Sequence, residues 1–257
     1  SIVLTINIIS GMPSDITNLF KNYVLADNMS IGGRFLAAII IFGVIIAVMA
    51  MVVVLQDAVR KISVQMSQKV QGRRQVGGQQ SNIPLKVNTA GVIPVIFASS
   101  LLQFPVVIAS FFGKGQAGWT NYFNQSNWCN PSNIKYSIGF VAYLLLIVFF
   151  AYFYTSITFN PIEVADNMKK QGGFIPGIRP GKPTQDYLNK ILNYIIFIGV
   201  IGLIIVVTIP LVFNGVFGAS VSFGGTSLII IVGVILETLK QIESQMLVRN
   251  YRGFLGD

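Results

Sequence analysis

Five long stretches of this chain contain almost no charged residues, and each is long enough to cross a lipid bilayer as a helix. They cover residues 35–55, 88–112, 136–159, 191–213 and 226–248. About 20 apolar residues in a helix span the roughly 30 Å hydrocarbon layer. The last stretch is the least clean, because Glu237 and Lys240 lie in its final turns. Five such segments in succession are not a soluble pattern, so the sequence predicts an all-α polytopic membrane protein.

The remaining segments connect these spans and carry most of the polar residues. Charged residues make up 11% of the chain, against about 25% in an average soluble domain. We expect cytoplasmic loops at 56–87 and 160–190 and a cytoplasmic tail at 249–257. The predicted outer loops are 12–34, 113–135 and 214–225. Residues 1–11 are already apolar but too short to span alone, and we interpret them as the end of a truncated helix.

Positive charge is distributed unevenly between the two sets of loops. Of the 18 Lys and Arg residues, 14 lie in the two predicted cytoplasmic loops, at the end of the last span or in the tail. Cytoplasmic loops of membrane proteins carry an excess of Lys and Arg. This bias sets the orientation and explains the net charge of +9 without a nucleic-acid ligand. Ribosomal RNA or anionic lipid stays compatible with it.

The composition offers little for catalysis. The chain has no histidine, and its single cysteine, Cys129, lies in an outer loop. No acidic residue lies deep within a predicted span, whereas ion-coupled transporters and intramembrane proteases need buried carboxylates. We therefore expect no enzyme activity, no metal site and no cofactor.

The loop 160–190 begins with the signature of a short capped helix. Asn160 suits the N-cap, Pro161 suits the first helical position, and Glu163 suits a capping-box carboxylate. Lys169 and Lys170 complement the helix dipole in the last turn. A loop with this much local structure is more than a connector.

A turn rich in proline and glycine follows this helix. Gly172 can end the helix in the left-handed region, and the segment 174–181 then holds Arg179 at a stiff tip. A guanidinium presents five donors in a planar fork, which suits a carboxylate or a phosphate. Thr184 is expected to cap the next span. The rigid frame favours a contact role for Arg179.

The loop 56–87 contains alternating apolar and polar residues at 62–66, which suit a β-ribbon, with continuation of the helix as the alternative. Farther along, Arg73 and Arg74 form a basic cluster in the middle of the loop. They serve either as an orientation signal that touches lipid headgroups or as a protruding contact for a partner.

The span 88–112 combines a predicted cap at Asn88 with two prolines, Pro94 and Pro105. Its polar residues, which include Ser99, fit hydrogen bonding between helices. A helix bent at these prolines would also suit an alternative function. The chain would then be half of a secondary transporter, with a substrate site near Pro94 and Ser99. In the last span, Glu237 and Lys240 can pair on one helix face. Outer-loop aromatics suit the membrane interface: Trp119, Tyr122 and Trp128.

Three strings of residues closely resemble the SecY family, the channel-forming subunits of the bacterial Sec translocon. They read NPIEVADNMKKQGGFIPGIRPG at 160–181, LKVNTAGVIP at 85–94 and GGTSLII at 224–230. The resemblance covers the whole chain. It implies the C-terminal half of the SecY helical bundle, with five full transmembrane helices, the end of a sixth, and structured cytoplasmic loops.

The resemblance also implies roles for individual residues. A hydrophobic pore ring would include Leu4, Ile8, Ile96 and Ile230, with Leu4 where the family more often has isoleucine. A lateral gate that admits signal sequences would include Ser99, Ser100, Gln103 and Phe104. Contacts to a ribosome or to the SecA motor would come from Arg73, Arg74, Lys169, Lys170 and Arg179.

The function implied is a passive protein-conducting channel in the bacterial plasma membrane. It would pass unfolded polypeptides across the membrane and helices sideways into it, driven by a bound ribosome or SecA. The implied partners are SecE, SecG, signal sequences, nascent polypeptides, the lipid bilayer and the missing N-terminal half of the same protein. A motor outside this chain agrees with the lack of a phosphate-binding loop.

Overall fold

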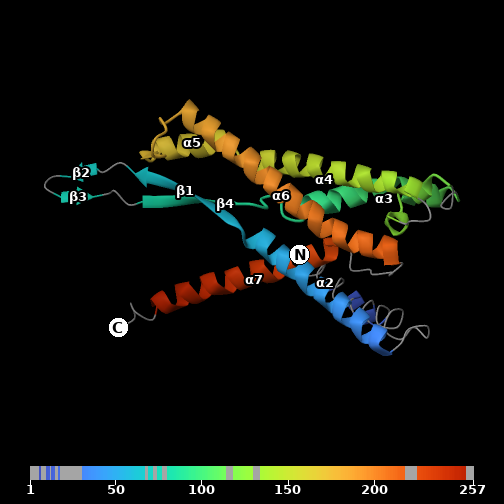
Figure 1. Cartoon of the computed structure of the whole chain (residues 1–257). Coiled ribbons are helices and arrows are strands. Elements are labelled where there is room, and N and C mark those ends of the chain that lie inside the picture. The colour runs from blue at the N-terminus through green and yellow to red at the C-terminus, as the bar shows by residue number, and fades with distance from the viewer. Residues whose placement is uncertain are drawn as a thin grey trace.

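A computed structural model of the chain describes residues 6, 10, 11, 13, 14, 17, 31–66, 69–71, 74–76, 80–113, 118–129, 134–217 and 225–252. Leu4, Ile8 and Arg73 lie outside the described residues. Between Phe111 and Ser137, the described residues include short 3-10 turns at Thr120–Tyr122, Gln125–Asn127 and Ile134–Tyr136. In chain order the main elements are α2 (Ile31–Asp57), β1 (Val59–Met66), β2 (Lys69–Gln71), β3 (Arg74–Val76), β4 (Gln80–Lys86), α3 (Ile93–Phe111), α4 (Ser137–Thr158), α5 (Pro161–Lys170), β5 (Gly173–Phe174), α6 (Lys182–Phe217) and α7 (Gly225–Arg252), as labelled in Figure 1.

The long helices α2, α3, α4, α6 and α7 overlap the five predicted spans. By length and composition, three segments of the described part can cross a membrane: Ile93–Phe111, Ser137–Lys170 and Lys182–Val212. The apolar helix Phe42–Asp57, within α2, is shorter. The predicted class, a polytopic helical membrane protein, is confirmed. A small sheet is added at one end, and the assignment of each loop to a side of the membrane stays a prediction.

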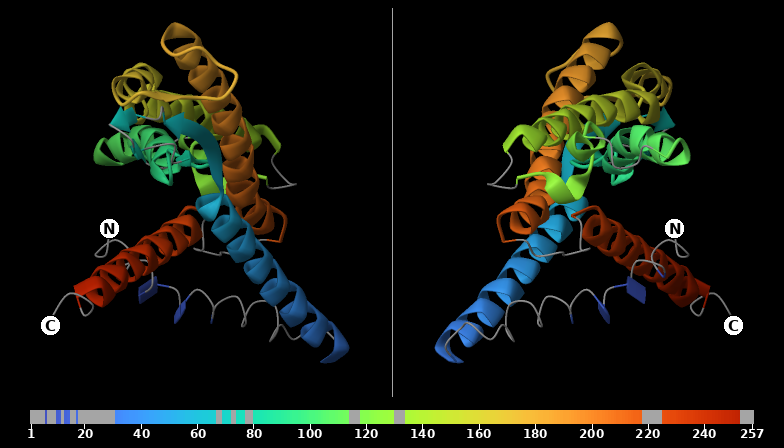
Figure 2. Two further views of the ribbon diagram at one scale, coloured as in Figure 1. Left: turned by 90° about the vertical axis from the view of Figure 1, so that its left-hand side faces the viewer. Right: turned by 90° about the vertical axis from the view of Figure 1, so that its right-hand side faces the viewer.

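One apolar core joins all five long helices. Glycine allows α6 to pack closely on α2, because a Cβ at Gly202 would lie 2.5 Å from Cδ1 of Leu55. Away from this core, α2 and α7 diverge (Figure 2). The buried residues of the core include Val52, Leu55, Val95, Ala98, Leu102, Tyr143, Ile147, Leu203, Val206, Val207 and Ile229.

The connection between α3 and α4 is folded onto this core. The side chain of Trp128 is fully buried, and its Nε1–H donates a hydrogen bond of 2.8 Å to the carbonyl oxygen of Tyr122. Its ring packs against Tyr143, with centroids 5.3 Å apart. The expectation that Trp128 lies in the membrane interface was wrong, because the indole finds both its apolar contacts and its hydrogen-bond acceptor inside the protein.

The opposite end of the molecule contains a three-stranded antiparallel sheet with the strand order β4-β1-β5. The predicted ribbon is confirmed, since β1 pairs with β4 from Val59↔Lys86 to Gln65↔Gln80. The strand β5 comes from the loop 160–190 and pairs with the end of β1. Beyond this sheet, β2 and β3 form a two-stranded antiparallel ribbon. The two predicted cytoplasmic loops therefore share one sheet.

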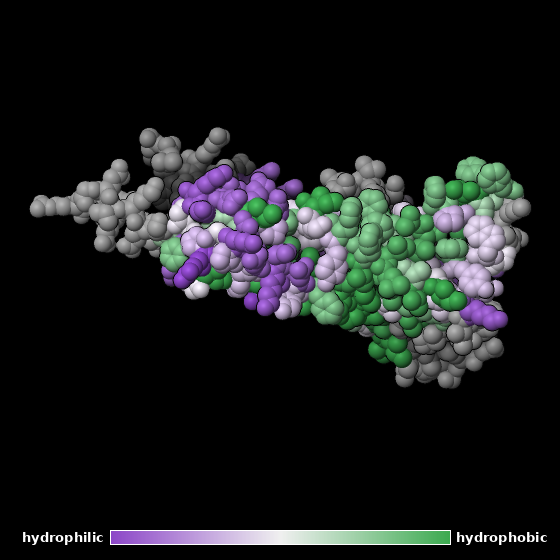
Figure 3. All heavy atoms as spheres, turned by 90° about the horizontal axis from the view of Figure 1, so that it is seen from above, coloured by the Kyte–Doolittle hydropathy of each residue, from purple (hydrophilic) through white to green (hydrophobic). Residues whose placement is uncertain are grey.

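A second apolar cluster fixes the sheet to α5 and α6. Alternate residues of β1, Ile62 and Val64, point inward and are buried, as the period of a half-buried strand requires. They join Leu85 from β4, Ala165 and Met168 from α5, Ile175, and three residues of α6, Leu188, Ile191 and Ile195. Figure 3 shows hydrophilic residues gathered over this end of the molecule and hydrophobic residues over the long helices.

Candidate functional site

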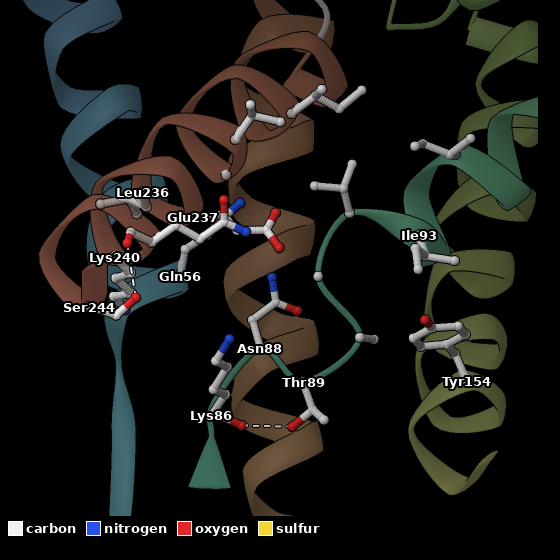
Figure 4. Close-up of a pocket in the computed structure, with 18 residues that line it drawn as sticks. Gln56, Lys86, Asn88, Thr89, Ile93, Tyr154, Leu236, Glu237, Lys240 and Ser244 are labelled. Carbon is white, nitrogen blue, oxygen red and sulfur yellow. Dashed lines mark hydrogen bonds between the residues drawn. The ribbon is translucent and has the colours of Figure 1, made fainter. Parts of the chain in front are cut away.

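A cavity of about 700 Å³ opens between α7, the turn that precedes α3, and α4 (Figure 4). Two of the predicted ring residues line it, Ile96 from α3 and Ile230 from α7. Ile96 is 36% exposed, and Ile230 is half-buried. The other lining residues are Gln56, Lys86, Asn88, Thr89, Ala90, Gly91, Val92, Ile93, Tyr154, Gly233, Val234, Leu236, Glu237, Lys240, Gln241 and Ser244.

Asn88 belongs to the wall of this cavity and does not cap a helix. The helix α3 begins at Ile93, because Gly91 has a φ of +63° and interrupts the helical backbone before it. The side chain of Asn88 is buried, and its Nδ2 has no hydrogen-bond partner within the described part of the chain. The prediction of a cap at Asn88 was therefore wrong. Nearby, the Thr89 hydroxyl donates to the carbonyl of Lys86 at 2.7 Å.

An ion pair connects the rim of the cavity to the end of α2. Nζ of Lys240 lies 2.6 Å from Oδ1 of Asp57, the last residue of that helix. The expected Glu237–Lys240 pair was wrong, since α7 packs against α2 and brings Asp57 within reach of the same ammonium. Both side chains of the observed pair are about half exposed, at 49% for Lys240 and 59% for Asp57.

The predicted gate residues lie along α3. Ser100, Gln103 and Phe104 are exposed, whereas Ala98 and Leu102 are buried in the core. Ser99 is half-buried, and its hydroxyl donates to the carbonyl of Ile96 at 2.9 Å, within its own helix. The three exposed residues make no hydrogen bond to another helix in the described structure. The expectation that the polar residues Ser100 and Gln103 join helices stays a prediction.

The capped helix of the loop 160–190 is confirmed as α5. Oδ1 of Asn160 accepts a hydrogen bond of 3.1 Å from the N–H of Ile162, and Pro161 occupies the first helical position. Lys169 and Lys170 are exposed in the last turn, and Gly172 follows with a φ of +71°. The local signals of this helix were sufficient to predict it.

The turn that carries Arg179 is fixed at both ends. Its first part is anchored by Ile175, which is buried and accepts a hydrogen bond of 3.0 Å from the N–H of Ile178. At the other end, the Thr184 hydroxyl donates to the carbonyl of Arg179 at 2.9 Å. The Arg179 side chain is exposed and has no ion pair or hydrogen bond within the described residues. This backbone holds the guanidinium outward.

Thr184 itself is not a helix cap. It lies inside α6, which begins at Lys182. The carbonyl of Gly181 accepts hydrogen bonds from the N–H groups of Thr184 and Gln185, at 3.0 and 3.2 Å. The prediction was wrong because the hydroxyl of Thr184 bonds backward to the turn.

Comparison with known proteins identifies the family. A family description, SecY, matches residues 1–239 of the chain. The chain belongs to the SecY family. The protein translocase subunit SecY of Streptomyces galbus is 50% identical, with 99% of this chain and 56% of the relative covered. That of Bacillus subtilis (strain 168) is 43% identical, with 99% and 58% covered. The chain thus spans little more than half the length of these SecY relatives.

Two solved structures have the same fold. One is described as the structure of a protein conducting channel, and the other concerns the plug domain of a SecY protein, which stabilises the closed state of the translocation channel. Each has a TM-score of 0.62 and 19% sequence identity to this chain. They cover 95% and 94% of this chain, and 57% and 59% of their own chains are matched.

Within this SecY-family chain, sequence patterns missed three features of the site. The two-residue strand β5 has no periodicity that could reveal it. Asn88 carried a signal, a polar residue ahead of an apolar span, but that signal equally fits a cap. Gln56 carried only a weak signal, an amide at the end of a predicted span. Its hydrogen bond is to α7, which is distant in the sequence.

Proposed function

We propose that this chain forms one side of a protein-conducting channel and that Ile96 and Ile230 belong to its constriction. The observation that carries the proposal is their position on two different helices, α3 and α7, around one cavity. Aliphatic side chains at a narrow point exclude water and ions, yet they yield to a passing chain without binding it. Leu4 and Ile8 would complete the ring, together with residues of the longer SecY relatives that this chain does not match.

Lateral release would use the exposed face of α3. Ser100, Gln103 and Phe104 lie on it, and Ser99 lies beside them. Polar groups there tolerate the partial loss of lipid contact that a sideways opening requires, while Phe104, at 63% exposed, offers an apolar surface to a signal sequence. This arrangement supports insertion of hydrophobic segments into the plasma membrane.

The driving force would come from a bound ribosome or SecA. The sheet shared by the two loops, and the hydrogen bonds that hold the turn with Arg179, support a docking surface at this end of the molecule. Positive charge would be added by Arg73, Arg74, Lys169 and Lys170. Such a surface suits ribosomal RNA phosphates or acidic side chains. SecE, SecG and the rest of the SecY protein would complete the channel, and the C-terminus would be cytoplasmic.

Electrical recording tests the constriction in the assembled translocase. We expect Ile96→Asn and Ile230→Asn each to raise the resting ion conductance of planar bilayers, because a polar side chain hydrates the narrow point. Ile242→Asn is the matched control, since Ile242 is an exposed residue of α7 that does not line the cavity. Unchanged conductance in both ring variants would remove these residues from the constriction. Uptake of a small solute without any polypeptide translocation would favour the secondary transporter.

A further inference from the structure

Gln56 joins the end of α2 to α7 at the residue before Ile230. Its Nε2–H donates a hydrogen bond of 3.0 Å to the carbonyl oxygen of Ile229. Ile229 is fully buried in the core, and Gln56 is half-buried at the edge of the cavity. In a helix, the same carbonyl accepts the N–H four residues later, so the amide adds a second donor at this point of α7. Gln56 thus contacts the backbone that positions Ile230.

Gly233 makes room for this contact. A Cβ at Gly233 would lie 2.9 Å from Oε1 and 3.1 Å from Nε2 of Gln56. Real Cβ atoms rarely approach polar atoms so closely, so a larger residue would displace the amide from its present position. Close packing at Gly233 therefore supports a specific seat for the Gln56 side chain.

The strand β1, the middle strand of the three-stranded sheet, begins close after Gln56 in the chain. Asp57 ends α2 and β1 starts at Val59. The residue between them, Ala58, is bonded on both sides: its N–H donates to the carbonyl of Val54 at 3.0 Å, and its carbonyl accepts from Val87 at 2.8 Å. The Asp57–Lys240 pair adds a second link between this junction and α7. No flexible linker separates the sheet from Gln56.

We propose that Gln56 is a positioning residue that transmits displacement of the β1–β4 hairpin to α7 at Ile229 and Ile230. A partner that pulls or tilts the hairpin would then move one side of the constriction. The inference rests on the proposed function, because it takes Ile230 as part of the constriction and the hairpin as part of the docking surface. Gln56 acts through α7 and does not itself close the pore.

A fluorescence experiment on the assembled translocase tests the coupling. An environment-sensitive probe is attached at Val234→Cys, which lines the cavity one turn after Ile230, in a Cys129→Ser background. Purified ribosomes, and separately SecA, are added, and the emission change is recorded. We expect Gln56→Leu and Gly233→Ala to reduce that change about two- to tenfold, the shift that loss of one hydrogen bond gives in a two-state equilibrium. Binding of the partner should be unaltered.

Two comparisons separate coupling from general destabilisation. Gln241→Leu removes an exposed amide from the same cavity and should leave the emission change intact. Among the described residues, no hydrogen bond joins this amide to α2. The double variant Gln56→Leu with Gly233→Ala should match either single variant, because both remove the same contact. Additive losses, or a full emission change in Gln56→Leu, would overturn the proposal.

The ion conductance of Ile230→Asn separates this inference from the proposed constriction. If Ile230→Asn raises the resting conductance while Gln56→Leu leaves the emission change intact, only the coupling role fails. If Ile230→Asn has no effect on conductance, the constriction fails, and with it the basis of the coupling. Thermal unfolding of each variant shows whether it is folded, and Gln56→Glu, of nearly the same size but without the donor, provides a second variant if Gln56→Leu does not assemble.

Discussion

Gln65 and Phe174 are partners in adjacent antiparallel strands, although α3, α4 and α5 lie between them in the chain. This pairing attaches the turn that carries Arg179 to the hairpin whose outer ribbon includes Arg74. Below it, Ile62 and Val64 of the hairpin and Ile175 of the turn are buried in one cluster. The base of the hairpin and the start of the turn are thus joined by one sheet and one apolar cluster.

The first prediction concerns this strand pair. Partner residues in an antiparallel ladder have Cα atoms about 4.5–5.5 Å apart, which falls within the range of about 4.4–6.8 Å that a disulfide needs. Gln65→Cys with Phe174→Cys, in a Cys129→Ser background, should therefore form a disulfide under mild oxidation, detected by mass spectrometry. Ser81→Cys with Phe174→Cys is the control, since β1 lies between β4 and β5. Equal crosslinking of both pairs would contradict the strand order.

The second prediction concerns Arg179. Arg179→Glu should abolish polypeptide translocation. It should not affect assembly, because the exposed side chain makes no ion pair or hydrogen bond within the described residues. If a partner binds this guanidinium in a desolvated contact, the rate should fall at least about tenfold. Lys182→Glu, the same charge change at the start of α6, is the control. Normal secretion by the Arg179 variant would refute the contact role.

Local signals were sufficient for α5 and for β1, which depend on residues close together in the chain. The cap at Asn160, Pro161 at the first helical position and the alternation of β1 were all readable, because the groups that satisfy each backbone atom lie within a few residues. The apolar spans were equally plain. A bilayer requires the helix to satisfy its own backbone, so length and composition suffice to predict it.

Features that depend on distant segments could not be predicted in this way. Asn88 and Thr184 were wrongly predicted for another reason: each suits more than one local role, and the deciding groups, Gly91 and Arg179, are close by in the chain. Trp128 is buried because Tyr122 supplies an acceptor and Gly139 leaves space for its ring. Lys240 pairs with Asp57 across two helices, whereas the sequence offered Glu237 on the same helix. Tertiary packing decides between such alternatives, and it leaves no periodic trace in the sequence.

The third prediction concerns the pH dependence of the Asp57–Lys240 pair. The hydrogen bond and the charge of Lys240 lower the pKa of Asp57 below its ordinary value of 3.8. A lowered carboxyl pKa gives stability that is fully present above the ordinary value and is lost as the pH falls through the lowered one. Asp57→Asn should therefore reduce thermal stability slightly at neutral pH and low salt. It should have no effect in acid below the lowered pKa of Asp57, where the carboxyl is protonated in both the folded and the unfolded state.

Salt and a second substitution check the same pair. Because both side chains are about half exposed, added salt should shrink the difference between wild type and Asp57→Asn. Glu237→Gln is the control, since Glu237 is exposed and has no partner among the described residues. A stability difference that persists unchanged in acid would show that Asp57 acts through packing and not through its charge.

The last prediction concerns Gly139, at the start of α4. A Cβ there would lie 2.6 Å from Nε1 of Trp128 and even closer to the carbonyl oxygen of Tyr122. Gly139→Ala must therefore separate the donor from its acceptor and displace the buried ring. We expect a loss of about 3 kcal/mol in the free energy of unfolding, with a red shift of tryptophan emission as the indole meets water. Gly118→Ala, in the same connection and with no atom within 4 Å of its Cβ, should change neither quantity. Equal thermal stability of the two variants would show that the segment around Trp128 can move away from α4 at little cost.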